Sequence, residues 1–398
     1  MNRLNAVFKP ESRFRLFFLS LLTAGISYGI YKGVIDNYLA EVVAIGELDR
    51  GVVEFFRELP GLVLVVILAV LYTFSAEKLY QLGAVIMLLG MGMLSVVSPT
   101  KILVTLAICI HSLGEHIQLG MKSTISLEYS RPGCGGQALG YQSAVSQIGT
   151  LVGYGVIIVS FLFLGDRKPF RVFFLISALV LAVSMFTSFG LTSQSQTDAA
   201  KRRFYFRRKY TKYYMLEVFY GARKQVFLTF GPYVLILFYG ASASVISLLF
   251  AASAILSFFL SPVVGRIIDR LGYKIVMVAD TLILVLVCVC YGFAHHVFPK
   301  EIAFYVCCVN YVLDSIISLA SMASNVYVQD ISDNSDQVKA TISTGISVNH
   351  MISVVIALFG GWIWSKLGIE TLFILSAVLG LCNSAYAATI KSVKKSAF

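Results

Sequence analysis

Charged residues are scarce in this sequence, and the shortage is its most informative feature. Of the 398 residues only 13% are Asp, Glu, Lys or Arg, whereas 58% are hydrophobic. A soluble domain carries about 25% charged residues, so the composition excludes an ordinary soluble protein. We therefore predict a multi-pass protein of a cell membrane, which in the simplest case is a bacterial inner membrane.

Signatures of enzymes, cofactor sites and disulfide frameworks are also lacking. The chain has no Walker phosphate-binding loop, no nucleophile elbow and no HExxH zinc motif. Its seven cysteines show no CxxC spacing and fall mostly in apolar segments, where cysteine acts as a small buried hydrophobic side chain. We expect neither an enzyme nor a cofactor, and we assign no metal site.

Long apolar segments dominate the chain. We count about twelve of them, each near the ~20 residues that cross a bilayer. They lie roughly at 14–38, 51–75, 79–98, 101–123, 138–164, 170–191, 213–239, 242–262, 274–294, 301–325, 338–364 and 369–390. With both termini cytoplasmic, most lysines and arginines lie on the inner side. This topology explains the net charge of +11 without a nucleic-acid partner.

The two halves of the chain repeat each other. Lys32 in YGIYKGVIDNYL corresponds to Lys224 in YGARKQVFLTFG, and AEKLYQLG (76–83) corresponds to IDRLGYK (268–274). Parallel half-repeats of this kind are typical of transporters. The longest polar connection is basic, which suits a cytoplasmic surface. We therefore expect a domain at 1–191, a cytoplasmic linker at 192–212 and a second domain at 213–398.

The segment GRIIDRLGYK (265–274) resembles the loop between helices 8 and 9 of major facilitator superfamily transporters, Gly-x-x-x-Asp-Arg-x-Gly-x-Lys/Arg. The resemblance implies an all-α fold of twelve transmembrane helices in two pseudo-symmetric six-helix bundles. It also implies gating at the cytoplasmic face, where an acid lies near a helix end and glycines permit a tight turn. The gating residues so implied are Gly265, Asp269, Arg270 and Gly272. In the first half, Glu77 and Lys78 replace the Asp-Arg pair.

By the same resemblance, helices 1, 4, 7 and 10 line a central cavity, and here each of them carries ionisable or amide side chains. An ionisable group within the bilayer costs roughly 2.5 kcal/mol or more, so each one needs a partner or a wet cavity. The candidates are Lys32, Asp36, His111, Glu115, His116, Glu217, Arg223, Lys224, Asn310 and Asp314. We expect the solute and the coupling ion to bind among them.

Lys32 and Lys224 are predicted to bind an anionic group of the solute. Two cations that face one cavity repel each other unless an anion or a carboxylate lies between them. Further predicted solute-binding residues are Tyr28, Asn310 and Arg57. Arg223 and Lys224 point about 100° apart, so at most one faces the cavity squarely; the repeat favours Lys224, and Arg223 would pair with a carboxylate on a neighbouring helix. Alternatively, Lys32 and Asp36 merely neutralise each other at i,i+4.

Four residues are predicted to couple transport to protons, because a carboxylate or imidazole near a cation in a low-dielectric cavity has a tunable proton affinity. They are Asp36, Glu115, His111 and Asp314. On the fourth helix the positions i, i+4, i+7 and i+11 form one polar stripe with a wetted face. These positions are His111, Glu115, Gln118 and Lys122.

The segment HSLGEH (111–116) does not fit a zinc-protease motif, since its histidines at i and i+5 lie about 140° apart. His111 and Glu115 would still supply two ligands of a metal site that Asp36 or Asp314 completes, and this alternative to proton coupling stays open.

Glu54, Arg57 and Glu58 share a face of the second helix at i, i+3 and i+4. We expect Glu54 and Glu58 to act in gating at an outer vestibule. The alternative is a salt bridge that packs this helix against the one that carries Asn349 and His350. Asp280, on the peripheral ninth helix, is expected to be structural.

The sequence thus predicts a monomeric secondary active transporter, a symporter or antiporter, that moves a small polar, anionic solute by alternating access with protons or sodium as the coupling ion. Two alternatives stay open. One is a polyspecific exporter of drugs, cations or divalent metals with the same fold, and the other is a transporter-like sensor that no longer cycles. No ATP-binding element is present, which argues against primary active transport.

Overall fold

The computed structural model describes residues 2–71, 73–132, 134–164, 168–192, 206–333 and 335–390. Within these ranges the chain forms helices and one isolated antiparallel bridge, between Phe8 and Ser130. Most of the expected linker, residues 193–205, lies outside the described residues, as do Lys201, Arg202 and Arg203.

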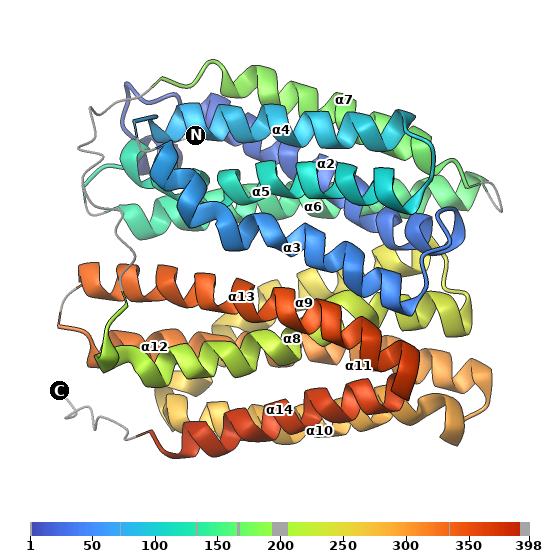
Figure 1. Cartoon of the computed structure of the whole chain (residues 1–398). Coiled ribbons are helices and arrows are strands. Elements are labelled where there is room, and N and C mark those ends of the chain that lie inside the picture. The colour runs from blue at the N-terminus through green and yellow to red at the C-terminus, as the bar shows by residue number, and fades with distance from the viewer. Residues whose placement is uncertain are drawn as a thin grey trace. The chain divides into compact units, whose positions relative to one another are not determined.

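Long helices follow the apolar segments of the sequence (Figure 1). The first half contains α1 (Asn2–Val7), α2 (Phe14–Glu41), α3 (Glu47–Val70), α4 (Ala76–Val96), α5 (Lys101–Tyr129), α6 (Gly135–Leu164) and α7 (Phe170–Ser188). The second half contains η1 (Arg208–Tyr210), α8 (Thr211–Tyr239), α9 (Ala243–Leu271), α10 (Tyr273–Val297), α11 (Lys300–Ile317), η2 (Ser318–Ser321), α12 (Met322–Ile331), α13 (Ser335–Leu367) and α14 (Ile369–Ala388).

Ten helical segments of the described chain are long and apolar enough to cross a membrane. One of them, Lys300–Ile331, runs through α11, η2 and α12. Helices α3 and α8 are not among the ten, and both carry several charged side chains, which lower the mean hydropathy of a segment. The chain is therefore a multi-pass membrane protein.

The chain divides into two compact units. Unit 1 comprises Met1–Ile45, Phe56–Arg202 and Ser242–Ala251, and unit 2 comprises Gly46–Phe55, Arg203–Ala241 and Ala252–Phe398. Compared with the expected domains, the first turns of α3 belong to unit 2 and the first turns of α9 belong to unit 1.

In unit 1, α2 packs against α6 and α7, and α4 packs against α5 and α7. Glycines allow α2 and α6 to approach closely: a Cβ atom at Gly29 would lie 2.2 Å from the carbonyl oxygen of Thr150. Close contacts between membrane helices are commonly formed by small residues such as glycine. Serine pairs add hydrogen bonds between α2 and α7, with 2.8 Å between the hydroxyls of Ser27 and Ser177. The helix that carries Lys32 is thus held on two sides.

In unit 2, α8 packs against α13 and α14, and α10 packs against α11 and α14. The Tyr291 hydroxyl of α10 donates a 2.6 Å hydrogen bond to the Gly231 carbonyl of α8. At the linker end of this unit, Lys212 donates to the carbonyl of Thr389, 2.8 Å away. These contacts fix the rotation of α8, on which Arg223 and Lys224 lie.

Candidate functional site

The repeated lysine of unit 1 has a partner on its own helix. Lys32 Nζ lies 2.9 Å from Asp36 Oδ2 one turn later on α2, and the two side chains are 18% and 1% exposed. The Lys32 ammonium also lies 5.1 Å from the centre of the Phe250 ring, which belongs to the same unit. Tyr28, one turn earlier, is half-buried. The i,i+4 pair expected from the spacing is present, so the charge of Lys32 is compensated locally.

The two adjacent cations of α8 have different surroundings. Arg223 is buried, and its Nη2 atom lies 3.1 Å from Asp280 Oδ2 on α10. Lys224 is exposed and makes no ion pair within the described part of the chain. The expectation that Arg223 pairs with a carboxylate on a neighbouring helix is confirmed. The partner shows that Asp280 holds α8 against α10, as expected of a structural residue.

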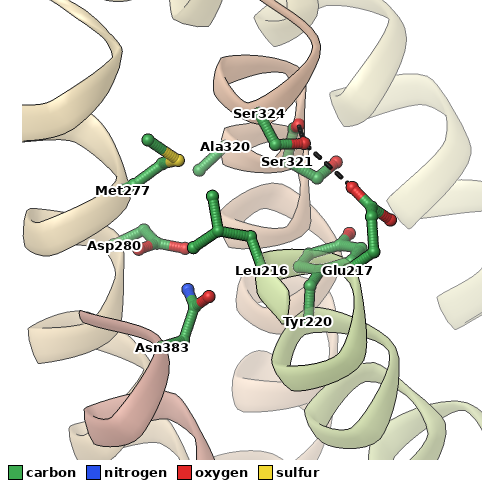
Figure 2. A pocket seen from close by; sticks show the side chains of 9 residues that line it. All are labelled: Leu216, Glu217, Tyr220, Met277, Asp280, Ala320, Ser321, Ser324 and Asn383. Carbon is green, nitrogen blue, oxygen red and sulfur yellow. Dashed lines mark hydrogen bonds between the residues drawn. The ribbon is translucent and has the colours of Figure 1, made fainter. Parts of the chain in front are cut away.

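A small pocket lies inside unit 2, between α8, α10, η2, α12 and α14 (Figure 2). Its empty volume is about 260 Å³, part of which is open to solvent. The lining residues are Leu216, Glu217, Tyr220, Met277, Asp280, Ala320, Ser321, Ser324 and Asn383. Glu217 accepts hydrogen bonds from Ser324 Oγ at 3.0 Å and from Asn349 Nδ2 at 3.4 Å. Asn383 is 5% exposed, and its Oδ1 atom has no hydrogen-bond partner among the described residues.

Sequence reasoning named two residues of this pocket but did not bring them together. Glu217 was one of the ionisable candidates without an assigned role, and Asp280 was expected to be structural. Asn383 could not be identified from the sequence, because an isolated asparagine in an apolar segment does not reveal which neighbours it faces.

The polar stripe expected on α5 does not have one wetted face. His111 is buried, and its ring centre lies 4.8 Å from that of Tyr31 on α2. Gln118 is also buried and donates a 3.0 Å hydrogen bond to the Tyr80 carbonyl of α4. Only Glu115 and Lys122 are partly exposed. The prediction is wrong for His111 and Gln118, because α5 turns these two positions toward neighbouring helices.

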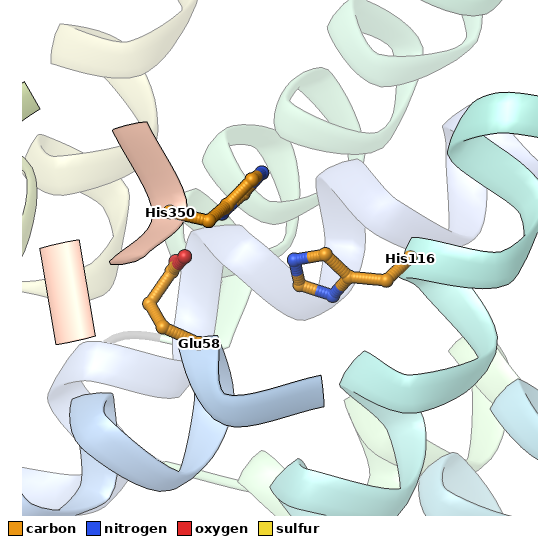
Figure 3. A group of neighbouring side chains, drawn as sticks. All are labelled: Glu58, His116 and His350. Atoms are coloured by element: carbon orange, nitrogen blue, oxygen red, sulfur yellow. The ribbon is translucent and has the colours of Figure 1, made fainter. Parts of the chain in front are cut away.

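His116 of α5 lies near Ser112 and Glu58 in unit 1. Its Nδ1 atom lies 2.8 Å from the Ser112 carbonyl, while the Ser112 hydroxyl donates to the carbonyl of Arg57. A ring nitrogen of His116 lies within 4.8 Å of a carboxylate oxygen of Glu58 on α3 (Figure 3). His111 and Glu115 belong to no group of three metal-ligating side chains in the described ranges.

Ion pairs lie along α3 in both units. In unit 2, Glu54 Oε2 lies 2.8 Å from Arg50 Nη1, and Glu54 Oε1 accepts a 2.9 Å hydrogen bond from Gln225 of α8. In unit 1, Arg57 pairs with Glu58. Arg50 was missed, although its i,i+4 spacing to Glu54 was visible in the sequence. The gating roles of Glu54 and Glu58 stay predictions.

The two polar residues of α11 are both buried. Asn310 donates a 2.7 Å hydrogen bond to the Val306 carbonyl of its own helix. Asp314 is 8% exposed and forms no ion pair with Arg223 or Lys224 of α8 within the described residues. The proton-coupling role of Asp314 stays a prediction, and the amide nitrogen of Asn310 is already used by its own helix.

The loop that carries the family motif has the predicted turn at one of its two glycines. Gly272 directly precedes α10 as its N-cap and has a φ of +84°, a conformation that favours glycine. Gly265 instead lies inside α9, and a Cβ atom there would have no neighbour within 4 Å. The expectation that Gly265 helps to form the turn is therefore wrong. Asp269 and Arg270 are exposed.

The corresponding loop of the first half is built differently. Ser75 caps α4, and Glu77 behind it is buried, with neither carboxylate oxygen hydrogen-bonded among the described residues. Lys78 is exposed.

Comparisons with known proteins agree with one another. Residues 213–396 match the family model of the Major Facilitator Superfamily. The structure is similar to that of the nucleoside transporter NupG (D323A mutant), with a TM-score of 0.75 and 16% identity over 95% of this chain and 99% of that one. It is similar to a D-xylose-proton symporter, with a TM-score of 0.70 and 13% identity over 94% and 96% of the two chains. It is also similar to a peptide transporter POT in complex with sulfate, with a TM-score of 0.72 and 13% identity over 94% of this chain and 93% of that one.

A search of curated proteins gives no match. At identities this low, the solved structures show a shared fold and carry no statement about the solute. The family match and the shared fold together confirm the resemblance drawn from residues 265–274.

Proposed function

We propose that this protein of the major facilitator superfamily is a proton-coupled secondary active transporter for a small anionic solute. The main support is a contrast between two cations of α8. Arg223 pairs with the carboxylate of Asp280, whereas Lys224 is exposed and makes no ion pair in the described ranges. An ionisable group at membrane depth is costly unless it meets a partner or a wet cavity. An anionic group of the solute is the partner that fits Lys224.

Transport as the general activity is supported by the family and the fold. The three similar structures named above are those of a nucleoside transporter, a sugar-proton symporter and a peptide transporter. We extend the ten apolar spans by α3 and α8 to twelve, with both termini cytoplasmic in a bacterial inner membrane. The chain acts as a monomer, carries out transport and no catalysis, and works by alternating access.

The pair on α2 supports proton coupling. Asp36 holds Lys32 at 2.9 Å while the carboxylate is charged. A proton on Asp36 removes the attraction between the two groups, so that Lys32 becomes available to the solute. Binding of the anion and binding of the proton then favour each other, which is what a symporter requires. Glu115, His111 and Asp314 are further candidates for carrying the proton, and Tyr28, Asn310 and Arg57 for contacting the solute.

The cation or metal exporter and the non-cycling sensor make different predictions. Glu58 and His116 lie close enough to serve a cation, which favours the exporter. Glu77 is buried, whereas its counterpart in the second-half loop, Asp269, is exposed, which favours the sensor. Each alternative gives a distinct result in the transport experiment.

The experiment uses purified full-length protein in liposomes adsorbed on a solid support, challenged with pooled organic anions, cations, sugars and divalent metals at two pH values. We expect a current evoked by anions that grows when protons are supplied with them. The current should be lost in Lys224→Gln and kept in Lys300→Gln, which changes an exposed lysine at the start of α11. Current with cations or metals that survives in Lys224→Gln would support the exporter. No current and no uptake of labelled solute with any pool would support the sensor.

A further inference from the structure

Unit 2 carries a second polar cluster at the end opposite the linker. His295 and His296 lie in the last turn of α10, and Glu370 lies in the first turn of α14. His295 Nε2 and His296 Nε2 lie 3.1 Å and 2.6 Å from the same atom, Glu370 Oε1. One ligand atom from each of the three side chains lies within 4.8 Å of the others. None of these residues belongs to the proposed transport machinery.

The surrounding structure holds the three side chains in place. The His295 ring meets the Phe238 ring of α8 edge-on, with 5.3 Å between the ring centres. Gly368 has a φ of +89°, and a Cβ atom there would lie 2.5 Å from Glu370 Oε2, so glycine both makes the turn and leaves room for the carboxylate. The helix dipole at the start of α14 favours a negative charge at Glu370. The cluster is therefore prearranged by α8, α10 and α14.

The donor set is chemically selective. Two imidazoles and one carboxylate suit borderline divalent metals such as Zn²⁺, whereas Mg²⁺ and Ca²⁺ prefer oxygen ligands. Tetrahedral Zn²⁺ with bonds of about 2.0–2.1 Å places its donors about 3.3 Å apart. The observed 2.6 Å and 3.1 Å separations approach this value, so small side-chain rotations suffice. All three side chains are partly exposed, which leaves a path for the ion and a position for water.

We propose that His295, His296 and Glu370 form a binding site for a divalent transition metal, typified by Zn²⁺, that joins the end of α10 to the start of α14. The ion replaces the two histidine–glutamate hydrogen bonds with three coordinate bonds and so stabilises unit 2. With the termini cytoplasmic, as proposed above, the site faces the outside of the cell. This site could not be predicted from the sequence, because Glu370 is far from the two histidines along the chain.

The test titrates Zn²⁺ into chelator-treated, full-length protein in detergent and follows heat and thermal stability. We expect one equivalent of Zn²⁺ to be lost, or to bind at least ~10-fold more weakly, in both His296→Gln and Glu370→Gln. The control His116→Gln should keep this equivalent, and Mg²⁺ should not compete for it. His296 is exposed and Glu370 is partly exposed, so neither change opens a cavity in the core.

A spectroscopic reading supports the assignment independently. Cu²⁺ bound to the wild-type site should show hyperfine coupling to two imidazole nitrogens, and to one in His296→Gln. Equal stoichiometry and affinity in wild type and both variants, or no Zn²⁺ binding by wild type, would overturn the proposal and leave only a hydrogen-bonded joint. Because the readout is metal binding, failure here leaves the transport proposal untouched.

Discussion

The two helices that carry the repeated lysine compensate their charges in different ways. On α2, the carboxylate of Asp36 follows Lys32 by one turn. On α8, the corresponding position is Leu228, and Arg223 pairs with a carboxylate that comes from α10. Lys224 is left exposed. The repeat thus keeps a lysine in both units but not the carboxylate beside it. Lys32 in unit 1 is compensated on its own helix, whereas Lys224 in unit 2 is available to a solute.

The largest expected effect concerns the pair between α8 and α10. Arg223→Met leaves Asp280 buried without its cation, and breaking a buried pair in this way costs about 3–5 kcal/mol. Thermal unfolding of the purified protein measures the loss. Lys224→Met is the matched control, because an exposed position should change stability by no more than about 0.5 kcal/mol. Equal losses in the two variants would mean that the pair does not distinguish the two cations.

Transplanting the arrangement of unit 1 into unit 2 sharpens the comparison. Leu228→Asp gives Lys224 a carboxylate at i+4, as in α2, and should reduce the anion-evoked current at least ~10-fold because the lysine is neutralised. Leu228→Asn has the same shape without the charge and should keep most of the current. If both variants lose the current equally, packing at this position explains the loss and the charge does not.

Removing the carboxylate of unit 1 tests coupling. In Asp36→Asn, Lys32 is permanently free, so solute binding should persist while the dependence of uptake on an inward proton gradient disappears. Radiolabelled uptake with and without the gradient measures this, and Asp36→Glu should restore part of the dependence. If uptake by Asp36→Asn still depends fully on the proton gradient, Asp36 is not the coupling residue, and Glu115, His111 or Asp314 would be tested next.

The two glycines of the loop at 265–274 allow a smaller, matched test. Gly272→Ala should destabilise the protein by about 1–2 kcal/mol, because φ is +84° at this position. Gly265→Ala has open space around its Cβ position and lies in a helix, so it should be neutral or stabilising by up to about 1 kcal/mol. Denaturation of both variants under one condition decides between them. Equal destabilisation would mean that the turn geometry at Gly272 is unimportant.

The smallest effect is expected at the linker end of unit 2. Hydrogen bonds from Lys209 and Gln337 hold the pKa of Asp333 below its usual value. A lowered folded-state pKa stabilises the fold above the unfolded pKa of about 3.9, and the contribution disappears as the pH falls through the lower folded value. The small difference in melting temperature between wild type and Asp333→Asn should therefore be present at pH 7 and vanish in strong acid. A difference that persists in acid would exclude this charge effect.

Local spacing in the sequence predicted some of these features, and distance along the chain hid the others. The apolar segments predicted the helices, and the i,i+4 spacing predicted the Lys32–Asp36 pair, because both depend only on neighbours within a helix. The same spacing rule would have found Arg50 beside Glu54.

Other contacts depend on how each helix is rotated against its neighbours. The identity of the carboxylate that pairs with Arg223, the burial of His111 and the meeting of His295 with Glu370 are set by tertiary packing. The periodicity of one helix indicates which side chains share a face, but it does not say which neighbouring helix packs against that face.

The most direct test of the central claim compares the two lysines in one electrical assay. Liposomes that contain wild type, Lys32→Gln or Lys224→Gln would be challenged with the active anion at a low and a high pH. The account predicts no current from Lys224→Gln at either pH, and a reduced current from Lys32→Gln that no longer depends on pH. A current from Lys224→Gln that equals that of wild type would contradict the assignment of Lys224 as the cation that binds the solute.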